Sequence, residues 1–317
     1  MTERLWLPSV GTARPWIGAD TLAPSTNDFT FALLSDRTGL ARPGVFERAV
    51  EVLNQLYPDF VIQIGDAIEG YTTDREVLAS QWQELDDILD ALERPLFRVV
   101  GNHDVSNELM RDEWVRRHGL LHYHFRYADT LFLVLDTSDP PQALEDVAGD
   151  LTPERLAELH AMVESDPEAV RREFEALADW DSTMPADISD EQIDYFERVL
   201  ADHTDARWTF VCMHIPAWQG DGHPALERLR KTLGERPYTM FAGHIHNYRR
   251  QVLHGRNHIR LGPCGGAWVR TGDEGNFDHV TLVRMTPAGP RIANLVLDGV
   301  LGVAGGTYPP PSAKGHP

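Results

Sequence analysis

Predominantly apolar runs alternate with helical segments in the first hundred residues, and each run ends at a polar block. Residues 29–34, 60–64 and 96–100 have the composition of strands that are buried on both faces. Between them, apolar side chains recur at helical spacing over 46–57 and 82–92. Strand, helix, strand, helix, strand predicts right-handed crossovers and a parallel sheet. Such a sheet places its functional site at the carboxyl ends of the strands.

The rest of the chain extends this α/β pattern. Further strands are expected at 131–135, 208–213 and 238–242, and a helix at 193–200 begins after a capping-box pattern at Ser189 to Gln192. After residue 249 the chain changes to short strands and turns, which predicts a second, antiparallel sheet. Those strands are expected at 252–253, 259–261, 280–283 and 292–297. The predicted organisation is a lead-in at 1–28, one domain at 29–305 and a Pro-rich tail at 306–317.

One segment of the domain is unusually acidic. Residues 139–187 carry fourteen acidic side chains against three arginines. Thr152-Pro153-Glu154 and Asp166-Pro167-Glu168 are good helix starts, and each is followed by apolar side chains at helical spacing. We expect a helical insertion between core strands, either a solvated excursion or, as the less favoured reading, a lid or partner surface.

Charge and composition limit the partners of the chain. The formal net charge of −20 opposes binding to long nucleic acid or to an anionic membrane, although bound metals could still attract a phosphate locally. The two cysteines suit no disulfide framework, and the N-terminus has no signal-peptide pattern. No apolar run approaches the length of a membrane span. The expected location is therefore cytoplasmic; the oligomeric state is left open.

Four blocks after strand-like runs supply metal-binding side chains. They are Gly65-Asp66, Gly101-Asn102-His103-Asp104, His214 and Gly243-His244-Ile245-His246, with Asp36 in an earlier, incomplete block. Carboxylate, amide and imidazole groups are the mixture that a pair of hard-to-borderline divalent metals needs.

If these blocks converge, Asp66 can bridge two cations. Asn102, His214 and His244 can complete one site, while Asp36 and His246 serve the other. Two such metals can share a hydroxide, lower its pKa and clamp a phosphoryl group. His103 can protonate the leaving-group oxygen, with Asp104 orienting its ring.

The order Asp, Gly-Asp, Gly-Asn-His-Asp, His, Gly-His-x-His resembles the calcineurin-like metallophosphoesterase superfamily, over roughly residues 29 to 250. The resemblance implies a four-layer α/β/β/α sandwich and a dinuclear site of Mn, Fe or Zn. It also implies hydrolysis of phosphomonoesters or phosphodiesters. Carried over by position, the metal ligands are Asp36, Asp66, Asn102, His214, His244 and His246, and His103 is the acid.

The first block departs from the superfamily, which usually has Asp-x-His where this chain has Asp36-Arg37-Thr38. Purple acid phosphatases also lack that His, and they recruit a Tyr three residues after the second-block Asp. The same spacing here reaches Glu69, which we hypothesise fills the vacant position and favours Mn or Fe. The alternative is a carboxylate outside the ligand set or one paired with Arg37. Thr38 is expected to be a cap or turn residue.

Two residues near the blocks have open roles. Arg37 could contact the substrate phosphate or form a structural ion pair, and His223 could line a substrate pocket or occupy a turn.

The expected function is hydrolysis of a small or modest-sized phosphorylated molecule. Monoesters and diesters are not distinguished. The competing hypothesis is a phosphatase-like binding or scaffold module that uses the acidic insertion.

Overall fold

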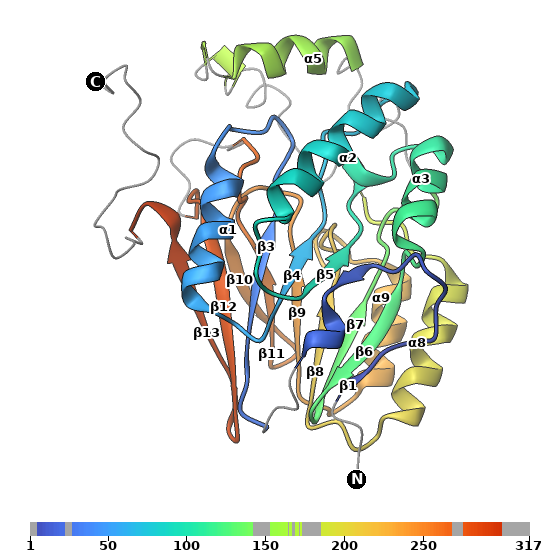
Figure 1. The fold of residues 1–317 in the computed structure, drawn as a ribbon. Helices are drawn as coiled ribbons and strands as arrows, with labels where there is room; N and C mark the ends of the chain where they lie inside the picture. The colour runs from blue at the N-terminus through green and yellow to red at the C-terminus, as the bar shows by residue number, and fades with distance from the viewer. Residues whose placement is uncertain are drawn as a thin grey trace.

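Two β-sheets stacked face to face and covered by helices on both outer sides make up the molecule (Figure 1). The computed structural model describes residues 5–22, 27–141, 153–163, 165–166, 169–170, 172, 185–267 and 275–299. The predicted four-layer α/β/β/α sandwich is confirmed. Among the described residues, no helix is both long and apolar enough to span a membrane.

The first sheet contains the strands predicted near the N-terminus. Its parallel centre is β3 (Thr30–Ser35), β4 (Phe60–Ile64) and β5 (Leu96–Val99). Antiparallel strands flank this centre: β12 (His279–Thr286) and β13 (Gly289–Val296) on one side, and β2 (Trp16–Ile17) on the other. The six-stranded order is β13-β12-β3-β4-β5-β2.

The second sheet has seven strands in the order β1-β6-β7-β8-β9-β11-β10. Its parallel centre is β7 (Thr130–Val134), β8 (Trp208–Cys212), β9 (Tyr238–Ala242) and β11 (Arg256–Arg260). Antiparallel β10 (Arg249–Leu253) forms one edge, and β6 (Tyr123–Tyr127) with β1 (Leu5–Trp6) forms the other. The strands after residue 249 thus join both existing sheets, so the prediction of a separate antiparallel sheet was wrong.

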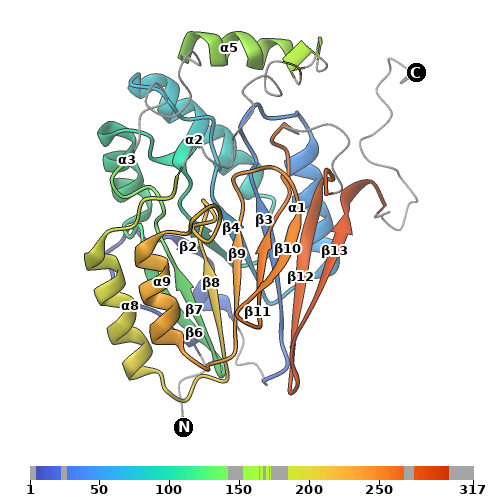
Figure 2. The same cartoon turned by 180° about the vertical axis from the view of Figure 1, so that it is seen from behind.

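Helices cover the outer faces. The first sheet carries α1 (Val45–Leu56), α2 (Arg75–Leu89) and α3 (Glu108–His118). Behind the second sheet lie α8 (Asp190–Asp202) and α9 (Pro224–Leu233), seen from that side in Figure 2. Side-chain caps begin several of them: Asp74 accepts from Glu76 N, and Asn107 accepts from Met110 N. The capping box expected at Ser189 is absent, since its hydroxyl donates to Asp139 instead.

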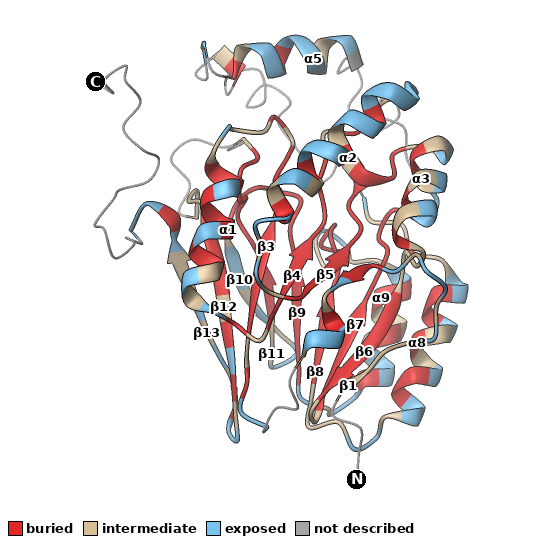
Figure 3. Cartoon of the chain, viewed as in Figure 1, coloured by how far each residue is buried: buried red, intermediate tan, exposed pale blue. Residues whose placement is uncertain are grey.

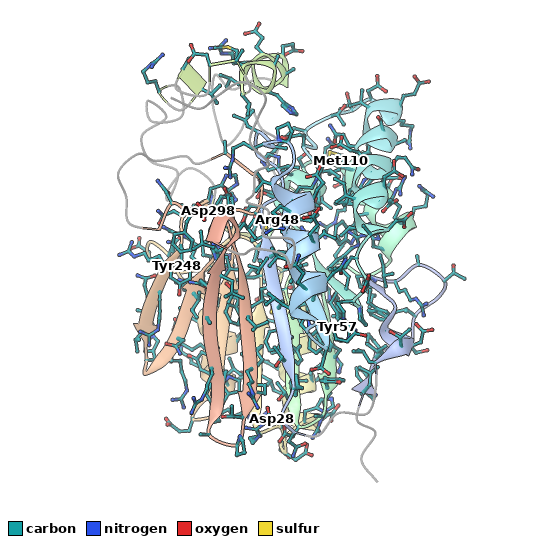
Figure 4. The ribbon with its side chains drawn as sticks, turned by 60° about the vertical axis from the view of Figure 1, so that its left-hand side comes forward. Asp28, Arg48, Tyr57, Met110, Tyr248 and Asp298 are labelled. Atoms are coloured by element: carbon teal, nitrogen blue, oxygen red, sulfur yellow. The ribbon has the colours of Figure 1, made fainter. Side chains whose placement is uncertain are left out.

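Three apolar clusters correspond to the three interfaces of this sandwich. The central one is aromatic: the rings of Phe125 and Phe132 stack at 4.4 Å, and Phe60 of the opposite sheet meets Phe132 edge-on at 5.5 Å. Figure 3 shows the central strands buried, the edge strands β10 and β13 partly exposed, and the helices exposed on their outer faces. Figure 4 brings α1 forward, with Arg48 on the helix and Tyr57 at its end. The strands are therefore rigidly packed supports for the loops at their carboxyl ends.

The N-terminal lead-in is structural, because β1 and β2 add one strand to each sheet. Of the expected acidic insertion, the described part includes α5 (Pro153–Met162), which lies beyond the carboxyl ends of β3 to β5 (Figures 1 and 2). The second expected helix, starting near residue 167, falls largely outside the described residues. The tail at 306–317 lies outside them altogether.

Candidate metal centre

The predicted ligand blocks converge where the carboxyl ends of the two sheets meet. Asp36 follows β3 directly, Asp66 lies two residues beyond β4, and Asn102 begins a 3-10 turn (Asn102–Asp104) after β5. His214, His244 and His246 follow β8 and β9 of the other sheet. The parallel strands therefore deliver these side chains to one place, as the strand pattern predicts.

Two overlapping groups of side chains could each hold a cation. Asp66, His214 and His244 form one, and Asp36, Asp66 and His246 form the other. Within each group the ligand atoms lie within 4.8 Å of one another, and all five residues are buried. We call these the His214 group and the Asp36 group. Because both contain Asp66, its carboxylate is placed to bridge two cations.

The backbone takes rare conformations at the ligands. Asp36, Asp66, His244 and His246 all have positive φ, between 49° and 75°, in the left-handed region that side chains rarely adopt. Such conformations cost free energy and persist only where the surrounding structure imposes them. Four of them at one convergence point mark it as a functional site.

Glycine is required beside two of the ligands. A Cβ atom at Gly65 would lie 2.4 Å from Nδ1 of His214, and one at Gly101 would lie 2.3 Å from the Asp66 backbone nitrogen. Neither clash can be relieved by a flexible side-chain end, because rings and backbone are involved. The Gly-Asp and Gly-Asn-His-Asp blocks thus use glycine so that the neighbouring loops can approach closely.

Backbone carbonyls hold two of the ligand imidazoles. Nδ1 of His214 lies 2.8 Å from the Ile64 carbonyl oxygen, and Nδ1 of His246 pairs with the Ala267 carbonyl oxygen. A carbonyl can only accept, so Nδ1 carries the proton in both rings. Nε2 is left as the ligand atom, and the second bond fixes the ring orientation, as is usual for metal-binding histidines.

Asp36 is held equally firmly. Its Oδ1 accepts a hydrogen bond of 2.8 Å from the His244 backbone nitrogen and lies 3.4 Å from Nε2 of His246. Its Oδ2 accepts from the Ser35 hydroxyl. The first-sheet carboxylate therefore ties down the loop of the second sheet that carries two of the imidazoles.

Burial and charge set the protonation of these groups. Burial opposes ionisation of Asp66, but the charges of His214 and His103 outweigh it and lower the pKa of the carboxyl. Burial likewise disfavours protonated His214, yet Asp66, whose Oδ2 is 2.9 Å from His214 Nε2, raises its pKa to about 9. For His244, burial together with the His214 charge lowers the pKa to about 3. The buried carboxylates thus stabilise positive charge at the place where cations would bind.

The donor set fits such cations. Nε2 of His244 is buried and has no hydrogen-bond partner among the described residues. A buried nitrogen of this kind is costly unless something coordinates it. With two carboxylates and three imidazoles in the two groups, the residues suit divalent metal ions.

The imidazole of His103 faces the same carboxylate from the edge of the site. Its Nδ1 lies 2.7 Å from the Glu69 carbonyl oxygen, which fixes the proton on Nδ1. Nε2, the atom free to exchange a proton, is 3.9 Å from Oδ2 of Asp66. His103 is about one-eighth exposed, so it can reach a bound substrate.

Asp104 does not orient that ring, so this part of the prediction needs correction. One of its oxygens accepts from the Gly101 backbone nitrogen, and the other accepts from those of Ala67 and Ile68. The buried loops carrying the ligands would otherwise leave these amides without partners. Asp104 fastens the two loops together, and the Glu69 carbonyl orients His103 instead.

Glu69 is not placed as a metal ligand. Its carboxylate accepts from the backbone nitrogens of Leu40, at 3.2 Å, and Ala41, at 2.7 Å. Neither candidate ligand group includes it. The loop after Asp36 turns sharply, with Leu40 at φ 65°, and its amides need acceptors. The structure thus favours the alternative of a carboxylate outside the ligand set, though not one paired with Arg37.

The other first-block side chains also bind the backbone. The Thr38 hydroxyl donates to the Ile68 carbonyl at 2.7 Å, which agrees with a turn role. Arg37 is buried; it donates to the Ala67 carbonyl and pairs with Glu84 of α2. The structural ion pair is therefore the correct alternative for Arg37, and a substrate contact is not supported.

Sequence reasoning missed Tyr71. This buried residue has φ 45°, and its hydroxyl accepts a 2.8 Å hydrogen bond from Nδ2 of Asn102. Its ring meets that of His103 edge-on at 4.7 Å. The bond engages the amide nitrogen of Asn102, so the amide oxygen is the atom that would bind a cation. An aromatic residue five positions after Asp66 was the only sequence signal, and it matches no block.

His223 caps the N-terminus of α9, where its Nδ1 accepts from the Ala225 backbone nitrogen at 3.2 Å. It also lines a pocket that includes His244. Both roles considered from the sequence, a local backbone role and a place beside the site, are therefore compatible with its position.

Two groups of buried carboxylates and imidazoles have one aspartate in common, and a histidine that can exchange a proton lies beside them. This arrangement is typical of a metal-dependent hydrolase. The family model described as calcineurin-like phosphoesterase matches residues 27–248. The chain belongs to this family.

Three solved structures with the same fold are compared with this chain. The first is a dimetal phosphatase from Danio rerio (15% identity, TM-score 0.50, covering 85% of this chain and 99% of that one). The second is PhoD (15%, 0.54, 91% and 70%), and the third is the purple acid phosphatase PPD1 from yellow lupin, Lupinus luteus (13%, 0.55, 90% and 53%). At these identities the likeness shows the fold alone. Comparison with curated protein sequences finds no match.

Proposed function

We propose that this chain hydrolyses a phosphomonoester or phosphodiester at a dinuclear metal centre. The observation that carries the proposal is that one carboxylate, Asp66, belongs to both ligand groups. Asp36 and His246 would hold the first cation with it, and Asn102, His214 and His244 the second. Bound there, two Mn, Fe or Zn ions would activate water and neutralise the charge of the phosphoryl group.

His103 supplies the proton in this proposal. Since its Nδ1 proton is held by the Glu69 carbonyl, protonation and deprotonation occur at Nε2. In the protonated ring, Nε2–H donates to the leaving-group oxygen as its bond to phosphorus breaks. Tyr71 packs against the ring and limits its rotation. The side chain thereby delivers the proton along one direction.

The proposed substrate is a small or modest-sized phosphorylated molecule, in keeping with the net charge of −20. A long nucleic-acid backbone or an anionic membrane would be repelled by a molecule of this charge. The proposed location is the cytoplasm.

The first test is metal dependence. Protein stripped with a chelator should not hydrolyse p-nitrophenyl phosphate or bis-p-nitrophenyl phosphate, and Mn, Fe or Zn should restore one or both activities. The faster of the two substrates assigns monoesterase or diesterase. Absence of turnover with every metal would favour the scaffold module.

The second test separates His103 from the ligands. His103→Asn should lower kcat for alkyl phosphates by about 10²-fold or more, but much less for p-nitrophenyl phosphate, whose leaving group needs no proton. Metal content should stay unchanged. His254→Asn, at an exposed turn, is the matched control. An equal loss on both leaving groups would remove His103 from the acid role.

A further inference from the structure

A pocket of about 380 Å³ lies against the candidate metal centre. Its lining includes His244 and Ile245 of the ligand loop after β9, so it begins at the centre itself. The other wall comes from residues 215–217 and 219–224, which follow His214, and from residues 185 and 186. A volume of this size is typical of sites for small organic groups.

The loop that forms this wall is built by its own backbone bonds. Gln219 N donates to the Pro216 carbonyl at 3.0 Å, Gly222 N to that of Gln219 at 2.9 Å, and His223 N to that of Ala217 at 2.8 Å. Gly222 has φ 74°, which a side chain would strain. The pocket is thus largely formed before a ligand arrives.

The lining of the pocket is largely apolar and offers no basic Lys or Arg side chain among the described residues. Ile215, Pro216, Ala217 and Ile245 give the apolar walls. Apart from its histidines, the only ionisable side chain in this described lining is acidic, Asp221. A second phosphate or a carboxylate of the substrate would therefore meet no compensating charge in this pocket.

Two polar side chains give the pocket hydrogen-bonding capacity. Because Nδ1 of His223 accepts from the Ala225 backbone nitrogen, the neutral ring carries its proton on Nε2 and acts as a donor there. The Gln219 amide both donates and accepts. Polar groups among apolar walls suit a ring that has its own donors or acceptors.

We propose that this pocket binds the organic group esterified to the phosphate, and that this group is uncharged, ring-containing and of aryl to nucleoside size. The inference rests on the proposed function and narrows its substrate class. Esters of a neutral ring-containing alcohol fit the pocket, whereas substrates whose leaving group is itself a phosphate do not.

Kinetics of the full chain loaded with Mn test this. With p-nitrophenyl phosphate and adenosine 5′-monophosphate as neutral-group substrates and adenosine 5′-diphosphate as the anionic comparison, kcat/KM should favour a neutral-group substrate at least about tenfold. Which of the first two has the lower KM distinguishes aryl from nucleoside, because kcat for p-nitrophenyl phosphate also reflects its better leaving group. Preference for the diphosphate would overturn the proposal.

Variants locate the effect. Ala186→Phe fills the pocket, and His223→Asn removes the imidazole while keeping a side chain that caps helices well. Both should raise KM for the better neutral substrate about tenfold. The inhibition constant of inorganic phosphate should change less than twofold. Ala91→Phe, in a groove between α1 and α2, is the matched control. Unchanged KM in both pocket variants would overturn the proposal.

A binding measurement keeps this separate from catalysis. Saturation-transfer NMR on chelator-treated protein should show adenosine or p-nitrophenol in contact with the wild type and weakened contact with Ala186→Phe. If no ester is hydrolysed with any metal but this binding is seen, the proposed function fails and the pocket stands. If turnover occurs but neither compound binds, the pocket assignment fails.

Discussion

The two ligand groups share Asp66 but are unequally supplied. The His214 group has two imidazoles, and its proposed further ligand, Asn102, has its amide held by Tyr71. The Asp36 group has one further carboxylate and one imidazole. Side chains around the His214 group hold its ligands in place. Side chains around the Asp36 group form hydrogen bonds with main-chain groups instead.

That difference explains the irregular first block. Thr38 and Glu69, the two candidates for its vacant position, are both hydrogen-bonded to main-chain groups of neighbouring loops. The loops are thereby fixed, but no further ligand is gained. We therefore expect unequal affinity, with a tight cation at the His214 group and a weaker one at the Asp36 group, whose occupancy depends on metal supply.

The largest effect should come from the shared ligand. Asp66→Asn removes the charge that both groups use, so metal content should fall below one equivalent and kcat/KM by about 10³-fold or more. Elemental analysis and p-nitrophenyl phosphate turnover measure the two. Asp87→Asn, on the exposed part of α2, is the control. Retention of one tight equivalent would show that Asp66 does not serve both groups.

A new imidazole beside the Asp36 group should make the affinities of the two groups for a cation more equal. Thr38→His introduces the imidazole of the usual Asp-x-His block and should tighten the weaker cation about tenfold or more in a calorimetric titration. Thr38→Val, which also loses the bond to the Ile68 carbonyl, controls for that loss. If the two variants bind the weaker cation alike, position 38 does not face it.

The sequence predicted most of the strands, and it predicted that the candidate ligands meet at one place, because both are encoded locally. Apolar runs of strand length and a few side-chain types at their ends need no knowledge of distant contacts. The pairing of the strands after residue 249 could not be read in this way. Two-residue strands such as β1 and β2 are also too short to show a period.

The missed roles at the site all depend on close approach between loops. Glu69 and Asp104 accept from amides 28 to 37 residues away in the chain, and Tyr71 meets Asn102 across a similar separation. Spacing suggested Glu69 as a ligand by analogy, but it could not reveal which buried amides would need an acceptor.

A smaller effect is expected at Tyr71, which supports the His214 group. Tyr71→Phe keeps the ring against His103 but removes the acceptor for the Asn102 amide, so kcat should fall about tenfold. The affinity of the tighter cation should fall too, while the weaker one is unaffected. Tyr57→Phe, at an exposed position, is the control. Equal weakening of both cations would point to general loosening of the site.

Glu69 should affect stability rather than metal binding. Glu69→Ala leaves the amides of Leu40 and Ala41 without their acceptor and should lower the free energy of unfolding by about 1–2 kcal/mol. Two equivalents of metal should remain, measured with saturating Mn. A fall to one equivalent would restore the hypothesis that Glu69 is a ligand.

A stability effect of similar size contrasts the ligand histidines with His279, a buried histidine of β12 outside both groups. Burial lowers its pKa to about 4, whereas an exposed histidine in the unfolded chain titrates near 6.5. The unfolded state therefore binds the proton first, so this contribution to stability is present above pH 6.5 and is lost as the pH falls toward 4. Between pH 7.5 and 5 this contribution amounts to about 2 kcal/mol.

Urea unfolding with chelator should show that His279→Gln loses less stability over this interval than the wild type. The glutamine amide can keep a donor for the Phe277 carbonyl. An equal loss in both proteins would place the acid sensitivity in the ligand carboxylates and imidazoles instead.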